Sequence, residues 1–245
     1  MTIYSQQDLL TLHGSVVPRH VAIIPDGNRR WARQNAREAL EGHRAGSNIL
    51  VTLVEAAQKL GIKVLTIYAF STENWSRSPL EVEGLMNLLV DYLRSQLEPM
   101  IKQGVKLGHI GDLSSIPQNV REEFIKTEQA TCAGTNIDLV LAINYGGRDE
   151  ICRAVRRLVD DCQKGKKCME EIDEKLISSY LDTVPWGDPD LVIRTSGEHR
   201  TSNFLLWQSS YSEWFFESTL WPDFGPKQLL DAVFAYQRRD QRLGK

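Results

Sequence analysis

A compact group of polar residues follows an apolar run near the start of the chain. Residues 20–24 read as a buried strand, and Pro25 then leads directly into Asp26, Gly27, Asn28, Arg29 and Arg30. A carboxylate can hold a divalent cation, a glycine lets backbone amides approach an anion, and guanidinium groups bind phosphate oxygens through paired hydrogen bonds. The group therefore predicts a site for a metal-bound diphosphate at the end of a strand.

Length and composition limit the class of protein that carries this site. With 245 residues, 42% of them hydrophobic, the chain can bury the core of one large α/β domain, and no linker indicates two domains. The net charge of −3 gives no general reason to expect a nucleic acid as partner. The four cysteines have neither CxxC nor zinc-ligand spacing, so we expect reduced thiols in a cytoplasmic protein.

The first residues do not read as a targeting segment. They lack a basic region followed by an apolar core, and the chain has no uninterrupted apolar run of about 18 residues. We therefore expect a soluble protein with an N-terminal segment over 1–17 and one domain over 18–245.

Short β-branched runs alternate with longer helical patterns along the chain. The strand-like runs are 20–24, 63–70, 105–111, 137–143 and 190–195, and the helical patterns lie near 42–60, 79–101, 117–132, 147–164, 170–182 and 226–240. This rhythm predicts an α/β fold with a mostly parallel central sheet flanked by helices. Ser78, Pro79 and Glu81 form a start signal for the second of these helices.

Polar loops follow four of the predicted strands. Besides the loop after the first strand they are 71–77, 144–148 and 194–203, which are rich in arginine, hydroxyl, amide and carboxylate side chains. In open parallel sheets, ligands bind beyond the carboxyl ends of the strands. Four such loops at one rim, in a chain with net negative charge, predict a binding site for a polyanion.

Ordered motifs spread over most of the chain carry a resemblance to a known family. They are HVAIIPDGNRRWA (20–32), GHRAG (42–46), LTIYAFSTENWSR (65–77), NYGGRDEI (144–151), DLVIRTSGEHRTSNFLLWQ (190–208), Glu213 and LWPDF (220–224). The chain resembles the cis-prenyltransferases of the undecaprenyl diphosphate synthase (isoprenyl transferase) type. It lacks both the DDxxD box of trans-prenyl synthases and a GxxxxGK[ST] loop.

The resemblance implies a Mg2+-dependent activity and a fold with a hydrophobic tunnel. The enzyme would condense isopentenyl diphosphate repeatedly onto an allylic diphosphate such as farnesyl diphosphate, forming a Z double bond each time. The product would be a Z-polyprenyl diphosphate such as the undecaprenyl carrier lipid of cell-wall synthesis. The resemblance also implies a homodimer, with residues 213–242 contributing to the interface. Peripheral contact with the inner membrane face is expected because the product is strongly apolar.

The resemblance also implies a role for individual residues. Magnesium would be held by Asp26 and Glu213, and Asp26 and Asn74 would act in catalysis. The substrate-binding residues would be Gly27, Asn28, Arg29, Arg30, Trp31, His43, Ser71, Thr72, Glu73, Trp75, Arg77, Arg194, Arg200, Thr201 and Ser202. Family assignments make Asn74 the proton acceptor, but a neutral carboxamide is a very poor base near pH 7. We therefore prefer an orienting role for Asn74.

Several of these residues also have an ordinary structural interpretation. Asp26 could cap a following helix, Glu73 and Arg77 could form an exposed i,i+4 ion pair, and His43 could be a satisfied helix histidine. Trp31 and Trp75 could be walls or stacking partners, and Glu198 and His199 could be supports or ligands. The stripe Leu85, Leu88, Leu89, Tyr92 and Leu93 could be core or tunnel wall.

Four positions depart from the family pattern. Pro25 stands where methionine is usual, Arg29 and Ser196 stand where glycine is usual, and Ala39 stands where an arginine is common. Arg37 or Arg29 could supply the charge missing at position 39. Two other functional classes remain open, namely a non-catalytic subunit of a heteromeric prenyltransferase and an isoprenoid-diphosphate binding module without turnover.

Overall fold

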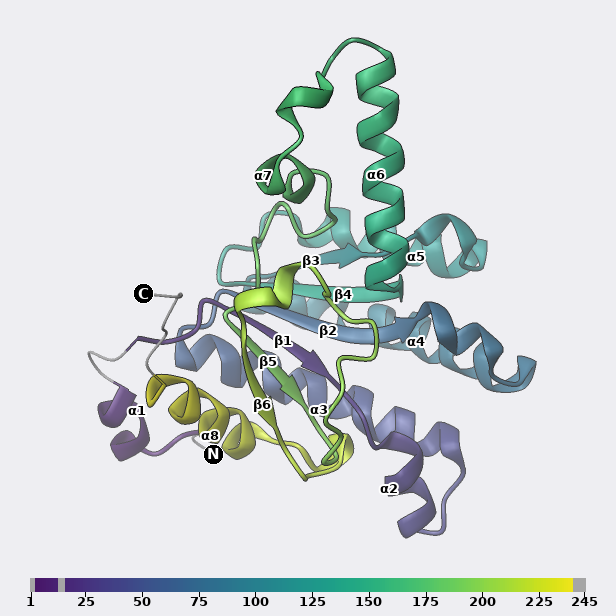
Figure 1. Cartoon of the computed structure of the whole chain (residues 1–245). Coiled ribbons are helices and arrows are strands. Elements are labelled where there is room, and N and C mark those ends of the chain that lie inside the picture. Colours follow the sequence, from purple (N-terminus) through teal and green to yellow (C-terminus); the bar gives the residue numbers. More distant parts are fainter. Residues whose placement is uncertain (1–2, 13–15, 240–245) are drawn as a thin grey trace.

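A six-stranded parallel sheet forms the centre of the computed structural model, which describes residues 3–12 and 16–239 (Figure 1). Every pair of neighbouring strands is parallel, and the strand order is β3-β4-β2-β1-β5-β6. The strands are β1 His20–Ile24, β2 Val64–Ser71, β3 Val105–Ile110, β4 Ile137–Tyr145, β5 Leu191–Arg194 and β6 Glu213–Phe216. The predicted fold class is thus confirmed.

The helices follow the predicted pattern, with two additions near the N-terminus. They are α1 Gln6–Leu12, α2 Asn28–Gln34, α3 Ala39–Leu60, α4 Pro79–Gln103, α5 Gln118–Thr131, α6 Gly147–Gln163, α7 Glu174–Ser178 and α8 Pro226–Gln237. The elements α1, α2 and β6 were not predicted, and the end expected for the last helix at 240 lies outside the described residues. As predicted, the Ser78 hydroxyl accepts a hydrogen bond from the Glu81 amide, 3.3 Å away, at the start of α4. No helix in the described part of the chain is both long and apolar enough to span a membrane.

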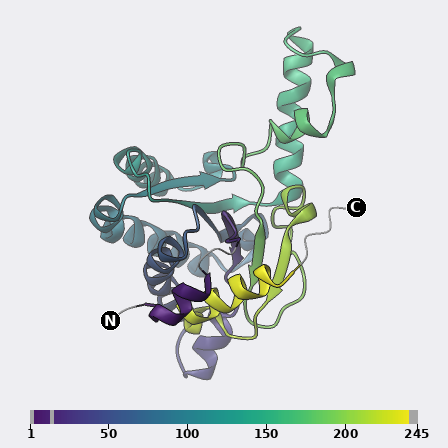
Figure 2. The same cartoon turned by 90° about the vertical axis from the view of Figure 1, so that its left-hand side faces the viewer.

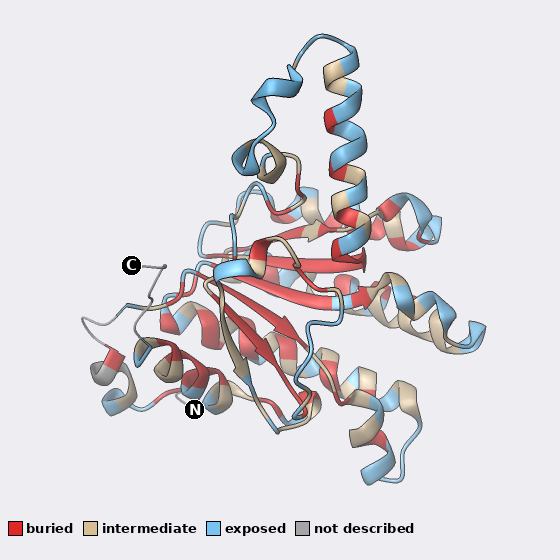
Figure 3. Cartoon of the chain, in the orientation of Figure 1, coloured by how far each residue is buried: buried red, intermediate tan, exposed pale blue. Residues whose placement is uncertain are grey.

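Side chains alternate between two cores on opposite faces of the sheet. In β1, Val21 and Ile23 belong to the larger core, which α3, α4, α5 and α8 cover. Tyr4 and Leu12 join this core from the N-terminal segment, where α1 lies beside α8 (Figure 2). Figure 3 shows that buried residues gather in the strands and on the inner sides of α3 and α8.

The second core is covered by a loop. Its strand residues pack against Phe204 and Leu205 from the segment between β5 and β6, with the rings of Phe204 and Tyr68 stacked at 4.5 Å. Helices α6 and α7 project away from the sheet at one end (Figure 1). The segment between β5 and β6 that covers this face also brings residues 196–203 to the rim of the sheet.

The strand order positions a crevice beside β1. The chain passes from β1 to β2 on one side, whereas β5 pairs with the other side of β1, in register with Ile24 opposite Arg194. Ligands bind at such switch points, outside the carboxyl ends of the strands. The loops after β1, β2 and β5 therefore meet there.

At the amino-terminal ends of the strands, a buried histidine joins β1 to β2. His20 is 1% exposed, its Nδ1 lies 3.0 Å from the carbonyl oxygen of Gly187, and its Nε2 lies 2.8 Å from the Thr66 hydroxyl. Burial lowers the pKa of His20 to about 4. The ring is therefore neutral at pH 7, and its contacts fit a proton on Nδ1.

This histidine predicts a pH-dependent stability. Because the folded-state pKa lies below 6.5, the unfolded chain takes up the proton first, and stability falls as pH drops from 6.5 towards 4. We expect His20→Asn to remove about 2 kcal/mol of the difference in unfolding free energy between pH 7 and pH 4.5. Urea titrations of both proteins at pH 7 and pH 4.5 measure this difference in unfolding free energy.

Thr66→Val provides the control for this prediction. It removes a hydrogen bond of His20 but no titratable group, so it should lower stability at both pH values and leave the pH dependence unchanged. If His20→Asn kept the pH dependence of the unsubstituted protein, His20 would not be the cause of the loss of stability at low pH.

Candidate active site

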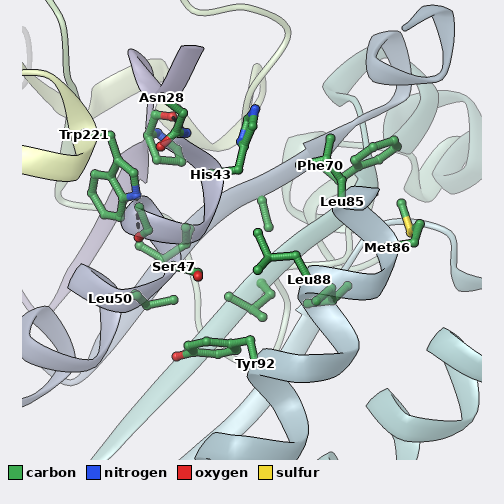
Figure 4. Close-up of a pocket in the computed structure, with 16 residues that line it drawn as sticks. Asn28, His43, Ser47, Leu50, Phe70, Leu85, Met86, Leu88, Tyr92 and Trp221 are labelled. Carbon is green, nitrogen blue, oxygen red and sulfur yellow. Dashed lines mark hydrogen bonds between the residues drawn. The ribbon is translucent and has the colours of Figure 1, made fainter. Parts of the chain in front are cut away.

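Three hollows meet at Pro25, beyond the carboxyl end of β1. The first, here the α2 cleft, is about 490 Å³ and is lined by residues 25–30 together with Arg33, Arg37, Ala39, His43 and Arg77. The second, here the β5 cleft, is about 530 Å³ and is lined by Ile24, Pro25, Asp26, Tyr68, Ser71, Glu73, Asn74, Arg77, Arg194, Arg200, Ser202 and Asn203. The third is an apolar cavity of about 120 Å³ between α3 and α4 (Figure 4). Pro25 lines all three hollows, and Asp26 lines both clefts.

Two glycines allow the backbone of residues 27–30 to face the α2 cleft. Gly27 precedes α2 with φ +106°, and a Cβ there would lie 3.0 Å from a methyl group of Leu220. A Cβ at Gly42 would lie 2.2 Å from the carbonyl oxygen of Asn28, so α2 and α3 are in direct backbone contact. Five arginines then line this cleft: Arg29, Arg30, Arg33, Arg37 and Arg77.

Asp26 is held at the junction of the two clefts by a buried arginine. Its Oδ2 accepts a hydrogen bond from Nη2 of Arg194 at 2.8 Å, and Oδ1 accepts from the Gly27 amide at 2.8 Å. Arg194 is 2% exposed and also donates to the hydroxyl of Ser202 at 2.7 Å. Asp26 thus does not cap α2, since Gly27 takes the N-cap position.

The segment 196–198 grips Arg30 with three acceptors. Arg30 donates to the carbonyl oxygen of Ser196 at 3.0 Å, to its hydroxyl at 3.1 Å and to Glu198 at 2.6 Å. Ser196 keeps a left-handed backbone, φ +69°, at this glycine position, and its hydroxyl adds an acceptor that glycine lacks. Glu198 also accepts from Arg200, and Arg200 and Arg30 together lower the pKa of Glu198. Glu198 is therefore a support for two arginines.

The loop after β2 places four predicted residues in the β5 cleft. Asn74 Oδ1 accepts a hydrogen bond from the Ser71 amide at 3.1 Å, which leaves the NH2 group of Asn74 for the cleft. Glu73 accepts from Nδ2 of Asn203 at 2.8 Å, while Arg77 pairs with Glu81 at 3.0 Å. The alternative in which Glu73 and Arg77 pair with each other is therefore wrong.

Asn203 is a site residue that the predicted set omits. Its Oδ1 accepts from the amide of Arg148 at 2.9 Å and its carbonyl oxygen accepts from the amide of Gly147 at 2.7 Å. With its bond to Glu73, Asn203 ties together the loops after β2, β4 and β5. Its place directly after Ser202 in a long polar motif was the available signal.

His43 and Asn28 form the neck between the α2 cleft and the apolar cavity. Both residues line both hollows, and His43 Nε2 and Asn28 Oδ1 are buried with no hydrogen-bond partner in the described part of the chain. Burial lowers the pKa of His43 to about 4, and the charge of Arg77 acts in the same direction. His43 is thus neutral at pH 7, and the interpretation as a satisfied helix histidine is wrong.

The apolar cavity receives one face of α4. Leu85, Leu88 and Tyr92 lie across it from Leu50 of α3, as Figure 4 shows, whereas Leu93 is fully buried in the core. Both interpretations of the leucine stripe therefore apply to different members. A cavity of about 150 Å³ accommodates benzene, so one of about 120 Å³ holds roughly five carbon atoms.

Four predicted substrate-binding residues do not line the clefts or the cavity. The indole of Trp31 donates to Asp223 at 2.8 Å and that of Trp75 donates to Asn144 at 2.7 Å, so both rings fasten loops. Thr72 and Thr201 also lie outside the three linings.

Glu213 lies far from Asp26 in space within a single chain. It starts β6 opposite Leu191 and forms an ion pair with Arg239, whereas Asp26 lies beyond the other end of β1, where Ile24 faces Arg194. The two carboxylates are thus separated by the length of β5 and by two strand spacings. They do not form a paired metal site in one chain.

Asp26 fits the carboxylate ligand of a magnesium ion. The described residues contain no group of three or more histidine, cysteine, aspartate or glutamate side chains placed to hold a metal. Magnesium often binds through one or two carboxylates, with phosphates and water completing its shell. Asp26, 31% exposed and facing both clefts, meets that requirement.

Two arginine-lined clefts thus lie beside a mostly apolar cavity in an α/β fold with a parallel sheet. A family profile described as "Putative undecaprenyl diphosphate synthase" matches residues 24–244, and the chain belongs to this family. The chain is 44% identical to an isoprenyl transferase of Clostridium perfringens over 93% of its length and 90% of the relative's. It is 46% identical to an isoprenyl transferase of Chlamydia trachomatis over 95% of its length and 93% of the relative's. Membership of this family supports cis-prenyl chain elongation as the reaction of this protein.

Solved structures show the same fold. The crystal structure of lavandulyl diphosphate synthase from Lavandula x intermedia, in complex with dimethylallyl diphosphate, aligns with a TM-score of 0.91 at 38% identity. The alignment covers 94% of this chain and 99% of that one. A probable undecaprenyl diphosphate synthase from Campylobacter jejuni aligns with a TM-score of 0.78 at 33% identity, covering 93% and 99%.

The buried ion pair predicts that the two carboxylates expected to bind metal differ in structural role. Asp26→Asn leaves Arg194 buried without its carboxylate, so we expect a loss of about 1–2 kcal/mol in unfolding free energy. The matched variant Glu213→Gln breaks a more exposed pair with Arg239 and should cost less than about 0.5 kcal/mol. Urea unfolding compares them, and equal losses would contradict the role given to Arg194.

Proposed function

We propose that the protein is a Mg2+-dependent cis-prenyltransferase that adds isopentenyl diphosphate repeatedly to an allylic diphosphate. The observation that carries this proposal is the position of Asp26, which faces both arginine-lined clefts where they join the apolar cavity. Such a junction suits two diphosphate substrates whose hydrocarbon parts must meet.

Each hollow has a place in this reaction. The α2 cleft would hold the allylic diphosphate on the backbone of Gly27 and Asn28 and on Arg30, with its hydrocarbon part passing His43 into the cavity. The β5 cleft would hold isopentenyl diphosphate on Arg194, Arg200 and Ser202. The complex of lavandulyl diphosphate synthase with dimethylallyl diphosphate supports an allylic diphosphate as substrate for this fold.

The chemistry begins with cleavage of the allylic C–O bond. Arginines that bind the departing diphosphate more tightly than the substrate ester lower the barrier to this step. Magnesium, held by Asp26 and phosphate oxygens, would add Lewis-acid stabilisation of the leaving group. The double bond of isopentenyl diphosphate then attacks the allylic carbon, and loss of a proton forms the new Z double bond.

Asn74 would orient the second substrate instead of accepting this proton. Its amide oxygen already accepts a hydrogen bond from the Ser71 amide, and its free NH2 group can only donate. A diphosphate oxygen is the better acceptor, because a neutral carboxamide is scarcely basic.

The remaining parts of the proposal are the product, the oligomeric state and the location of the protein in the cell. The cavity accepts about one five-carbon unit, so a growing chain would need more room than this cavity provides. We propose a Z-polyprenyl diphosphate product, such as the undecaprenyl carrier lipid, made from farnesyl diphosphate. A homodimer in the cytoplasm, in peripheral contact with the inner membrane face, is proposed from the family resemblance and the apolar product.

Product analysis tests the proposed function. Purified protein with farnesyl diphosphate, radiolabelled isopentenyl diphosphate and Mg2+ should form Z-polyprenyl diphosphates, and EDTA should abolish them. Asp26→Ala should still bind substrate but lose turnover, because the carboxylate acts mainly on the leaving group. Substrate binding without any product would instead support a binding module or a non-catalytic subunit.

Substitution of Asn74 tests its orienting role. We expect Asn74→Ala to lower kcat by about 100-fold, since the second substrate loses a hydrogen-bond donor near the reacting carbons. Asn74→Asp should be no faster, because a carboxylate repels the diphosphates. Single-turnover rates measure both variants, and an Asp variant as fast as the unsubstituted enzyme would contradict the orienting role.

A further inference from the structure

Charged side chains of alternating sign form a continuous chain across the junction of the two clefts. Arg30 lies 2.6 Å from Glu198, Glu198 also accepts from Arg200, and Arg200 lies 3.7 Å from Asp26. Asp26 in turn accepts from the buried Arg194 at 2.8 Å. Each carboxylate thus contacts two guanidinium groups.

Glu198 occupies a distinctive position in this chain. Arg30 lines only the α2 cleft, and Arg200 lines only the β5 cleft. Glu198 lines neither cleft, and its side-chain contacts in the described structure are to these two arginines, one through each carboxylate oxygen. It therefore sits between a cation of one cleft and a cation of the other.

We propose that Glu198 is a shared counter-ion that couples the two clefts, so that the state of Arg30 sets the affinity of the β5 cleft for a diphosphate. This inference rests on the proposed function, because it takes both clefts to bind diphosphates. Glu198 acts through the arginines and is a positioning residue.

The direction of the coupling follows from the contacts. A diphosphate in the α2 cleft competes with Glu198 for the guanidinium group of Arg30. Once Arg30 binds phosphate, the carboxylate of Glu198 interacts with Arg200 alone and holds it more strongly. Arg200 is then less available to an anion in the β5 cleft. Occupancy of either cleft thus lowers the affinity of the other, because coupling between binding sites is reciprocal.

Removal of Arg30 should imitate its capture by phosphate. Calorimetric titration with isopentenyl diphosphate compares the unsubstituted protein, Arg30→Ala, Glu198→Gln and the double variant. We expect Arg30→Ala to weaken binding about fivefold when Glu198 is present. In the Glu198→Gln background the same substitution should change the affinity less than about twofold, because the shared charge is absent.

Arg148→Ala is the control for loss of one positive charge at the same rim. Arg148 is exposed, lines neither cleft and has no ion pair among the described residues, so its substitution should leave the affinity within about twofold. An equal effect of Arg30→Ala in both backgrounds, or no effect in either, would overturn the coupling while leaving the proposed function intact.

A second measurement needs no substitution. Farnesyl S-thiolodiphosphate, an unreactive allylic analogue, should weaken isopentenyl diphosphate binding to the unsubstituted protein about fivefold. Unchanged or tighter binding would overturn the coupling. If the unsubstituted protein failed to bind isopentenyl diphosphate at all, the proposed function would fall together with this inference.

Discussion

The contact between Arg194 and Asp26 is the constraint on which the site depends. A guanidinium group that is 2% exposed requires a carboxylate partner, since an unpaired buried charge is costly. Parallel pairing of β1 and β5 sets Ile24 beside Arg194, and two residues later Asp26 supplies that partner. The direction of Asp26 towards both clefts is therefore determined by the sheet itself. Ser202 and the loop after β5 are attached to the same arginine.

A polar environment and an apolar one meet within a few residues of this contact. The clefts are polar and rich in arginine, whereas the cavity between α3 and α4 is mostly apolar. His43 and Asn28 lie where they meet, each with a buried polar atom that lacks a protein partner. A neutral imidazole suits this position, because a charged ring would bring a strongly hydrated group against hydrocarbon. This separation fits the proposed substrate, a diphosphate with a hydrocarbon tail.

Local pattern predicted the elements that carry their own apolar signal. The β-branched runs of β1, β2 and β4 announce buried strands, and α3 and α4 have long apolar faces. Helix α2 was not predicted because Ala32 is its one buried residue. Strand β6 was not predicted because it is a half-exposed strand of four residues at the edge of the sheet. The motif loops predicted which residues gather, but not the contacts between them. The grip of Ser196 on Arg30 depends on a left-handed backbone, and the distance of Glu213 from Asp26 depends on strand register; neither is visible in residue spacing.

Pro25 touches all three hollows, and this shared position limits how the site can diversify. A change at Leu85 or Leu88 alters the shape of the cavity wall but leaves the arginines of the two clefts in place. Any change at Pro25 alters both anion clefts and the cavity at once. The proline that stands where methionine is usual therefore bears on both clefts and the cavity together, whereas a substitution at Leu85 or Leu88 bears on the cavity alone. For an engineer, α4 offers a way to reshape the cavity alone, whereas a substitution at position 25 would change the two clefts as well.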